Sequence, residues 1–225
     1  MRHALILAAG RGERMRPLTD HTPKPLLECR GQPLIVHHIE KLVAAGVRDI
    51  VINTSYLAEQ FPAILGDGSR WGARLQFSYE GDVPLETGGG MLKALPLLGN
   101  EPFIVVSADI VSGIDYAALP HEPDGVAHLV MVPNPDFHPG GDFALAHGAL
   151  HGDDAPAGAE RLTFGNVGVY RQALVEGEAA GRFKLLPMYQ RAMAQGKLRG
   201  EKWSGFWRNV GTPAQLEEVR GAAVV

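Results

Sequence analysis

The sequence contains a single cysteine, Cys29, among 225 residues. One cysteine excludes a disulfide bond within the chain and any zinc site built from several cysteines. No apolar run reaches the roughly 18 residues of a membrane-spanning helix, and the N-terminal residues lack the layout of a signal peptide. We therefore expect a soluble cytoplasmic protein in a reducing compartment, with no membrane partner.

The sequence also lacks an excess of positive charge. Lysine and arginine number 21 against 25 aspartate and glutamate residues, which gives a formal net charge of −4. This balance argues against a protein that binds nucleic acid through its bulk charge. Basic residues near the N-terminus must then belong to a local site. Internal repeats, low-complexity segments and linkers are absent too, so we expect one domain over residues 1–225.

Apolar segments alternate with helical patterns along the first half of the chain. Short apolar strands are expected at 49–53, 75–79 and 103–107, after a first strand that begins near residue 4. Helices are expected at 34–43, 57–65 and 91–98. Strands alternating with helices predict a parallel sheet covered on both faces, so the fold class is α/β, a Rossmann-like three-layer sandwich.

The second half is less regular. Strands are expected at 126–132, 162–170 and near 205–210, with helices at 183–195 and 213–219 and a surface hairpin at 148–158. We expect the central sheet to be mixed but mostly parallel, with a nucleotide half at about 1–110 and an acceptor half at about 111–225. Ligands of such sheets bind beyond the carboxyl ends of the strands.

A glycine-bearing loop with four nearby cations follows the first strand. The stretch LILAAGRGERMRPLT occupies positions 5–19, and TPKPL follows at 22–26. Gly10 and Gly12 leave backbone N–H groups uncovered, and such groups can hold phosphate oxygens. The basic residues are Arg11, Arg14, Arg16 and Lys24. We expect this loop to bind the triphosphate of a nucleotide.

Two familiar phosphate motifs do not fit the loop. A dinucleotide fingerprint needs a third glycine where this chain has Met15, and a helix where it has Pro17. A P-loop needs G-x-x-x-x-G-K-[ST], which is missing from the sequence. A tight turn carrying surface arginines is the alternative, and the clustering of four cations argues against it.

The loop strongly resembles the signature of the sugar-1-phosphate nucleotidylyltransferases, L-A-A-G-x-G-x-R-M-x-P-L-T followed by P-K-P-L. The resemblance continues in LETGGG at 85–90, in AD at 108–109, in GGDF at 140–143, in NVG at 166–168, in FKLLP at 183–187 and in WRNVGT at 207–212. It implies a nucleotide-diphospho-sugar transferase fold. The likeness is greatest to the branch that transfers uridylyl from UTP to N-acetyl-α-muramate 1-phosphate in cell-wall recycling.

The resemblance implies a reaction in which a sugar-1-phosphate oxygen attacks the α-phosphorus of a nucleoside triphosphate and pyrophosphate leaves. The attacking phosphate is largely a dianion near neutral pH, so no general base is needed. Catalysis then depends on aligning two anions and neutralising their charge. Arg14 matches the catalytic arginine of the family, and Lys24 matches the lysine that bridges the two phosphates. Arg11 and Arg16 could each be a phosphate clamp or a surface charge.

A magnesium site is also implied by the resemblance. Asp109 follows a buried strand and matches a Mg²⁺ ligand of the family, although an aspartate there could also cap a helix. The second ligand of the family is an aspartate in W-x-D-V-G-T, where this chain carries Asn209. A neutral amide offers one carbonyl oxygen, so Mg²⁺ would be held more by phosphates or through water.

Substrate-binding residues are carried over from the matching segments. Besides Arg11 and Gly12, those for the nucleotide are Leu7, Ala8, Gly10, Glu80 and Gly88. Those for the sugar are Gly141, Asp142, Asn166 and Lys184. Lys184 could meet the lactyl carboxylate of muramate or be a surface lysine, and the glycines at 88–90 could instead be a close-packing turn.

Alternatives remain open on the sequence alone. The acceptor could be mannose 1-phosphate with GTP, or choline phosphate with CTP. A non-catalytic regulator that binds nucleotide or sugar phosphate is the other class, and Asn209 is the feature that favours it. We expect a monomer, because the chain lacks the C-terminal assembly domain of larger relatives.

Overall fold

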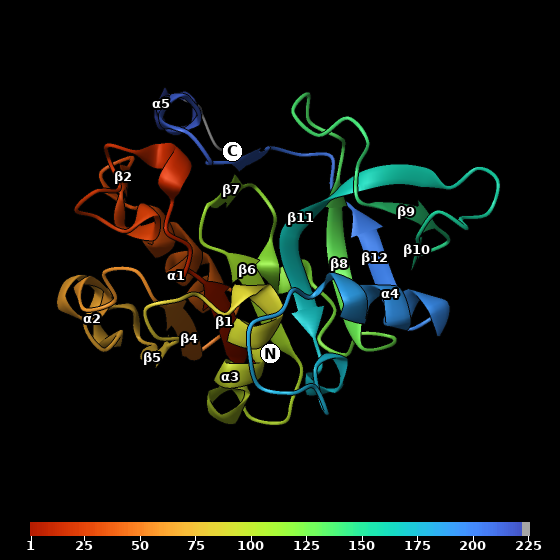
Figure 1. Ribbon diagram of the computed structural model, residues 1–225, viewed down its shortest axis with the longest axis horizontal. Helices are drawn as coiled ribbons and strands as arrows, with labels where there is room; N and C mark the ends of the chain where they lie inside the picture. The colour runs from red at the N-terminus through yellow and green to blue at the C-terminus, as the bar shows by residue number, and fades with distance from the viewer. Residues whose placement is uncertain (222–225) are drawn as a thin grey trace.

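The structure, a computed structural model, describes residues 1–221 of the chain. Within them, nine strands form one mixed sheet in the order β5-β4-β1-β6-β11-β8-β12-β10-β9 (Figure 1). Its first part is parallel and consists of β1 (His3–Leu7), β4 (Asp49–Thr54), β5 (Arg74–Tyr79) and β6 (Phe103–Ser107). Every residue of β4 is buried, as expected for a strand covered on both faces.

Helices cover both faces of this parallel part, which makes three layers. Helices α1 (Leu34–Ala44) and α2 (Gln60–Leu65) share one apolar core with one face of β1 and β4. Helices α3 (Glu86–Leu98) and α4 (Leu186–Ala194) share a second core with the other face, and Figure 1 shows both in front of the sheet. The alternation along β1 is the reason: Ala4 and Ile6 face one core while Leu5 faces the other.

The second half of the chain extends the sheet with both strand directions. It contributes β8 (Ala127–Val132), β9 (Phe143–Ala146), β10 (Ala149–His151), β11 (Glu160–Tyr170) and β12 (Leu198–Lys202). Strands β8 and β12 are parallel, whereas β11 is antiparallel to β6, β8 and β9. The expected mixed, mostly parallel α/β sheet is confirmed, and every antiparallel pair within it includes at least one strand of this half.

Two small antiparallel strand pairs lie outside the main sheet. One joins β2 (Glu28–Cys29) to β3 (Gln32–Pro33), and the other joins β7 (Ile110–Ser112) to β13 (Trp207–Asn209). Helix α5 (Pro213–Gly221) follows β13. Short 3-10 turns occur at Glu13–Met15, Lys24–Leu26, Ser69–Trp71, Tyr116–Ala118 and Gln172–Leu174. Among residues 1–221, no helix has the length and hydropathy needed to cross a bilayer.

Several boundaries differ from the expected ones for identifiable reasons. The helix expected at 91–98 begins at Glu86, because the three glycines lie inside it where another segment packs on them. The helix expected at 183–195 begins only at Leu186, because the residues before it form a non-helical segment held to α3. Strands β9 and β12 were not expected, since β9 is only four residues long and half alanine, and glycine and charged residues interrupt the apolar pattern of β12.

Candidate active site

The glycine loop begins where the strand order reverses. Strand β1 lies between β4 and β6, so chain connections leave it toward both sides and a crevice opens beyond its carboxyl end. The Ala8 N–H donates to Asn53 Oδ1 on β4 at 2.6 Å, and the Ala108 N–H donates to the Leu7 carbonyl oxygen at 3.0 Å. These two bonds fix the start of the loop against both neighbouring strands.

The loop itself is a tight turn anchored by a buried methionine. Gly12 adopts φ 64°, where a residue with a Cβ is strained, and an added Cβ would lie 3.1 Å from Lys24 Cβ. The Thr19 hydroxyl donates to the Gly12 carbonyl oxygen at 2.9 Å, and Met15 is fully buried beneath the turn. The turn therefore holds its backbone in place while its charged side chains remain outside.

Three of the four cations expected there line one depression of about 320 Å³. Arg11, Arg14 and Lys24 line it together with Gly12, Glu13 and Gly211. With Glu13 as the single acidic side chain among them, the depression carries a net positive charge that suits a polyphosphate. The depression therefore brings together the cations that the sequence assigned to the phosphates.

The fourth cation belongs to the surface. Arg16 is exposed and its Nε lies 3.4 Å from Asp20 Oδ1. It does not line the depression, which favours the surface alternative for Arg16. Arg11 instead donates to the carbonyl oxygen of Asp82 at 3.0 Å, which ties the glycine loop to the loop after β5.

Arg14 packs against a residue that lies far along the chain, Gly211. A Cβ added at Gly211 would lie 3.0 Å from Arg14 Nη2, so the guanidinium lies directly against this glycine. The Gly211 N–H donates to Gln215 Oε1 of α5 at 2.8 Å. Sequence reasoning did not single out Gly211, although it lies within the WRNVGT segment.

Asp109 and Asn209 come together through the β7–β13 pair. The Val210 N–H donates to the Asp109 carbonyl oxygen at 2.8 Å, and Asn209 is paired with Ile110. Lys24 Nζ lies 2.5 Å from Asp109 Oδ2, with both side chains largely shielded from solvent. Lys24 therefore contacts both the cationic depression and the candidate metal ligand.

The donor set fits a hard divalent cation. The Oδ1 atom of Asn209 is buried and has no hydrogen-bond partner among residues 1–221, which is costly unless something binds it. Asp109, whose backbone carbonyl pairs with Val210 next to Asn209, supplies a carboxylate as a second oxygen donor. Mg²⁺ prefers oxygen ligands and commonly takes one or two from protein and the rest from phosphates and water. Within the described chain, no group of three or more histidine, cysteine, aspartate or glutamate side chains is placed to hold a metal.

A second depression of about 320 Å³ adjoins the loop on the β4–β5 side. It is lined by Leu7, Ala9, Gly10, Asn53, Glu80, Pro84, Glu86, Thr87 and Arg182. Glu80 is buried and accepts hydrogen bonds from Asn53 Nδ2 and the Leu85 N–H, both at 2.6 Å. Burial raises the pKa of Glu80, and these two bonds oppose the rise. The structure thus places Glu80 in the wall of this depression, where its two bonds join β4 to the start of α3.

Two of the three glycines of α3, Gly88 and Gly89, form a docking surface for a segment of residues 181–185, which we call the strap, whereas Gly90 lies against the Glu80 side chain. A Cβ at Gly88 would lie 2.4 Å from the Phe183 ring, and one at Gly89 would lie 2.1 Å from the Gly181 carbonyl oxygen. The Gly88 and Gly89 N–H groups both donate to the Phe183 carbonyl oxygen. The close-packing alternative for these glycines therefore describes the structure, with Gly88 covered by Phe183.

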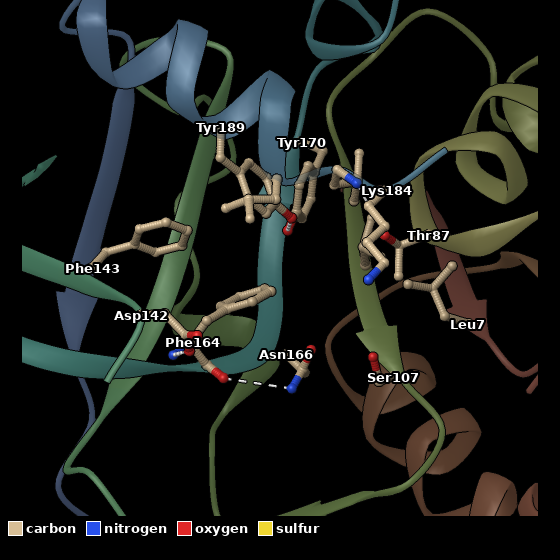
Figure 2. Close-up of a pocket in the computed structure, with 13 residues that line it drawn as sticks. Leu7, Thr87, Ser107, Asp142, Phe143, Phe164, Asn166, Tyr170, Lys184 and Tyr189 are labelled. Carbon is tan, nitrogen blue, oxygen red and sulfur yellow. Dashed lines mark hydrogen bonds between the residues drawn. The ribbon is translucent and has the colours of Figure 1, made fainter. Parts of the chain in front are cut away.

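The strap carries charges toward two neighbouring depressions. Arg182 lines the one beside the loop and pairs with Glu86 at 2.8 Å. Lys184 lines a third cavity, of about 300 Å³, between the strap, β11 and α4 (Figure 2). Leu7 and Thr87 line both spaces, so the two are contiguous.

The third cavity has a polar mouth and an aromatic end. Asp142, Asn166, Lys184, Ser107 and Thr87 supply the polar groups. In Figure 2, the Lys184 ammonium points toward the space between Phe164 and Ser107. The aromatic end consists of Phe143, Phe164, Tyr170 and Tyr189.

Asn166 enters this cavity through an irregularity of β11. The register of β11 against β8 shifts between Phe164 and Gly168, and Asn166 adopts φ 56°. Asparagine tolerates this left-handed conformation better than most residues, and bulges often re-aim a side chain beside a site. Asp142 uses Oδ2 to accept from the Phe164 N–H at 2.8 Å and Oδ1 to contact His138 Nε2 at 3.1 Å.

Gly141 has a structural reason to be glycine. It has φ 59°, and an added Cβ would lie 2.6 Å from Asn134 Oδ1. It therefore shapes the turn that delivers Asp142, and it does not line the cavity. Residues missed by sequence reasoning include the aromatic side chains at the cavity end, Thr87, Ser107 and Arg182. The aromatic residues gave no signal because their patterns are those of ordinary core positions.

Comparison with known proteins agrees with this arrangement. Residues 3–128 match the nucleotidyl transferase family. The N-acetylmuramate alpha-1-phosphate uridylyltransferase of Neisseria meningitidis is 44% identical over 98% of this chain and 97% of its own length. The chain belongs to the nucleotidyl transferase family. The resemblance noted in the sequence is thereby confirmed.

Other family members are less similar. The N-acetylmuramate alpha-1-phosphate uridylyltransferase of Caulobacter vibrioides is 35% identical over 93% of this chain and 92% of its own length. A mannose-1-phosphate guanylyltransferase of Mycobacterium tuberculosis is 31% identical over 98% of this chain but only 63% of its own length. Among solved structures, the inositol-1-phosphate CTP transferase from T. maritima superposes with a TM-score of 0.77 at 17% identity, covering 100% of this chain and 98% of that one. This last likeness concerns the fold, which is the nucleotide-diphospho-sugar transferase fold expected.

Proposed function

We propose that this protein joins UTP and N-acetyl-α-muramate 1-phosphate to give UDP-N-acetylmuramate and pyrophosphate, as part of cell-wall recycling. The observation that carries the proposal is the 44% identity, over nearly the full length of both chains, to a protein named for that activity. The cationic depression around the glycine loop and the two contiguous cavities beside it, which suit a triphosphate, a nucleoside and an acceptor, support it.

The chemistry follows from the positions of the cations. Lys24, between Asp109 and the phosphate depression, would hold the acceptor phosphate against the α-phosphate. Arg14 would neutralise the negative charge that accumulates on the leaving pyrophosphate, and the glycine at 211 holds it in place for that purpose. The rate gain comes from orienting two anions that repel each other in solution.

We also propose that Mg²⁺ is the cofactor, held by Asp109 and Asn209. The unpartnered Oδ1 of Asn209 and the adjacent carboxylate support this assignment. When bound, the ion would neutralise phosphate charge and help align the phosphates. Leu7, Ala8, Gly10, Gly12 and Arg11 are then the nucleotide-contacting residues, with Glu80 and Gly88 supporting them from behind.

The experiment that tests the proposal measures pyrophosphate release from a panel of nucleoside triphosphates and sugar 1-phosphates. The expected result is release with UTP and N-acetyl-α-muramate 1-phosphate at a kcat/KM at least tenfold above any other pair. Release chiefly with GTP and mannose 1-phosphate would favour the second candidate, which the 31% identity to a guanylyltransferase supports. No release with any pair, together with retained nucleotide binding, would favour the regulator.

The monomeric state and the division into a nucleotide half and an acceptor half stay predictions. The sheet runs through both halves, so we propose that they unfold as one unit. Sedimentation velocity at several concentrations would test the monomer. A single denaturant transition seen by two spectroscopic probes would support the single domain.

A further inference from the structure

The aromatic end of the third cavity is unusual for a site that holds a sugar phosphate. Phe143 and Phe164 each pack edge-on against the Tyr189 ring, with centroids 5.9 Å and 6.0 Å apart. Figure 2 shows Phe143 and Tyr189 at one end of the cavity, away from Lys184. The hydroxyls and phosphate of a simple hexose 1-phosphate would gain nothing from such apolar surface.

A pair of hydroxyl groups lies within this aromatic surface. Tyr170 Oη and Tyr189 Oη are 2.7 Å apart, and both side chains are almost completely buried. One hydrogen is shared between the two oxygens, which leaves the second hydroxyl hydrogen without a hydrogen-bond acceptor among residues 1–221. A buried donor of this kind is suited to a carbonyl oxygen of a ligand.

We infer that this end of the cavity, formed by Phe143, Phe164, Tyr170 and Tyr189, is an acyl box that selects sugar 1-phosphates bearing an N-acetyl group. The amide carbonyl accepts the spare tyrosine hydrogen, and the acetyl methyl packs between the phenyl rings. The inference deepens the proposed function and rests on it for the orientation of the sugar. Lys184, at the other end, is left to meet a negative substituent of the ring.

The test compares the binding of N-acetylglucosamine 1-phosphate and glucose 1-phosphate, which differ in the acetamido group alone. Calorimetric titrations, with and without a non-hydrolysable UTP analogue and Mg²⁺, give both affinities independently of turnover. The wild-type protein should bind the acetylated sugar roughly tenfold or more tightly, since a well-filled apolar contact discriminates by about 10-fold or more.

Two variants distinguish a role of the acyl box in binding from an effect on the stability of the protein. Phe164→Ala removes one wall and should abolish the preference, so that its affinities for the two sugars lie within about twofold of each other. The double variant Tyr170→Phe, Tyr189→Phe keeps every ring and removes both hydroxyls, a change that is close to neutral for folding because neither partner is left unpaired. It should lower the affinity for the acetylated sugar alone.

Phe77→Ala serves as the matched control, because Phe77 is a partly buried ring of β5 that packs on the opposite core. It should lower stability and leave the preference intact. An equal affinity of the wild-type protein for the two sugars, or an undiminished preference in both box variants, would overturn the inference. Failure of the proposed function is a separate result: it is the absence of pyrophosphate release with UTP and N-acetyl-α-muramate 1-phosphate, which these titrations do not measure.

Discussion

Arg14 belongs to the N-terminal glycine loop and packs against Gly211 near the other end of the chain. We propose that it stabilises the leaving pyrophosphate. Replacing Arg14 with alanine should lower kcat by roughly 10²–10³, the range seen when one preorganised donor to a transition-state charge is removed. Arg14→Lys should recover part of this loss, because lysine keeps the charge but loses the planar fork of donors. Steady-state pyrophosphate release measures both variants.

Arg16→Ala is the matched control, since Arg16 is exposed and paired with Asp20 on the same loop. Its kcat should stay within about twofold of the wild-type value, as is usual for exposed ion pairs. Equal losses in the two alanine variants would show that overall charge of the loop, and not the seat of Arg14, supports the reaction.

The second prediction at the scale of single residues concerns Asn209. In Asn209→Asp, a carboxylate replaces the amide oxygen that lacks a partner among residues 1–221, so the concentration of Mg²⁺ needed for half-maximal rate should fall at least severalfold. A magnesium titration of the initial rate provides the measurement. An unchanged titration curve would remove Asn209 from the shell of the metal.

Lys184 is expected to distinguish acceptors by charge. Lys184→Ala should raise the KM for N-acetyl-α-muramate 1-phosphate by roughly tenfold, because a charge-assisted bond to the lactyl carboxylate is lost. The KM for N-acetylglucosamine 1-phosphate, which lacks that carboxylate, should hardly change. Lys93→Ala, on the exposed face of α3, is the control. A parallel rise for both acceptors would contradict the role of Lys184 in recognising the lactyl group.

At the scale of elements, the contact between α3 and the strap leaves no room for a side chain at Gly89. In Gly89→Ala, the new methyl would meet the Gly181 carbonyl oxygen at 2.1 Å. Overpacking costs about 1–3 kcal/mol, against the roughly 1 kcal/mol that alanine gains over glycine in a helix. We expect a net loss of stability in urea unfolding and a raised KM for both substrates, because the strap carries Arg182 and Lys184.

Gly221→Ala in α5 is the control, since a Cβ there meets no atom within 4 Å. It should be neutral or slightly stabilising. If Gly89→Ala behaved in the same way, the strap would be free to move away from α3 without consequence, and its proposed part in positioning the two cations would be wrong.

The elements also show what a sequence can predict. The glycine loop, β1, β4, β6 and α1 were predicted because buried apolar runs and helical periodicity are local signals. The cationic depression followed from the same local reading. Residues 183–185 of the strap were expected to be helical, since nothing local shows that two glycines in another helix would bind the Phe183 carbonyl oxygen. The acyl box was missed for a related reason, because only the fold brings Phe143, Phe164 and Tyr189 together.

At the scale of the whole molecule, one buried histidine should make the free energy of unfolding depend on pH. His38 of α1 is 3% exposed and its Nδ1 lies 2.8 Å from the Tyr116 hydroxyl. Burial lowers the pKa of His38 to about 3, with nearby Lys41 adding to the effect. The unfolded chain takes up a proton near pH 6.5 and the folded chain does not, so stability is present above that pH and is lost as the pH falls toward 3.

Between pH 7 and pH 5, this histidine should remove about 2 kcal/mol from the free energy of unfolding. His38→Gln should lose that part of the pH dependence, whereas His121→Gln, at an exposed position, should keep it. Denaturant unfolding at both pH values, without nucleotide or metal, measures the difference. Identical pH slopes for His38→Gln and the wild-type protein would show that His38 is protonated in the folded state.

The distance along the chain between the two sides of the metal site has a consequence for synthesis. The parallel strands β1, β4, β5 and β6 are complete once Ser107 has been made, but Asn209 and the glycine beneath Arg14 are translated much later. A nascent chain can therefore build its phosphate loop early while the support for Arg14 and the second metal ligand are still missing. If Asn209 and Arg14 act as proposed, nucleotide turnover should begin only after Asn209 and Gly211 have been translated, without any separate inhibitory device.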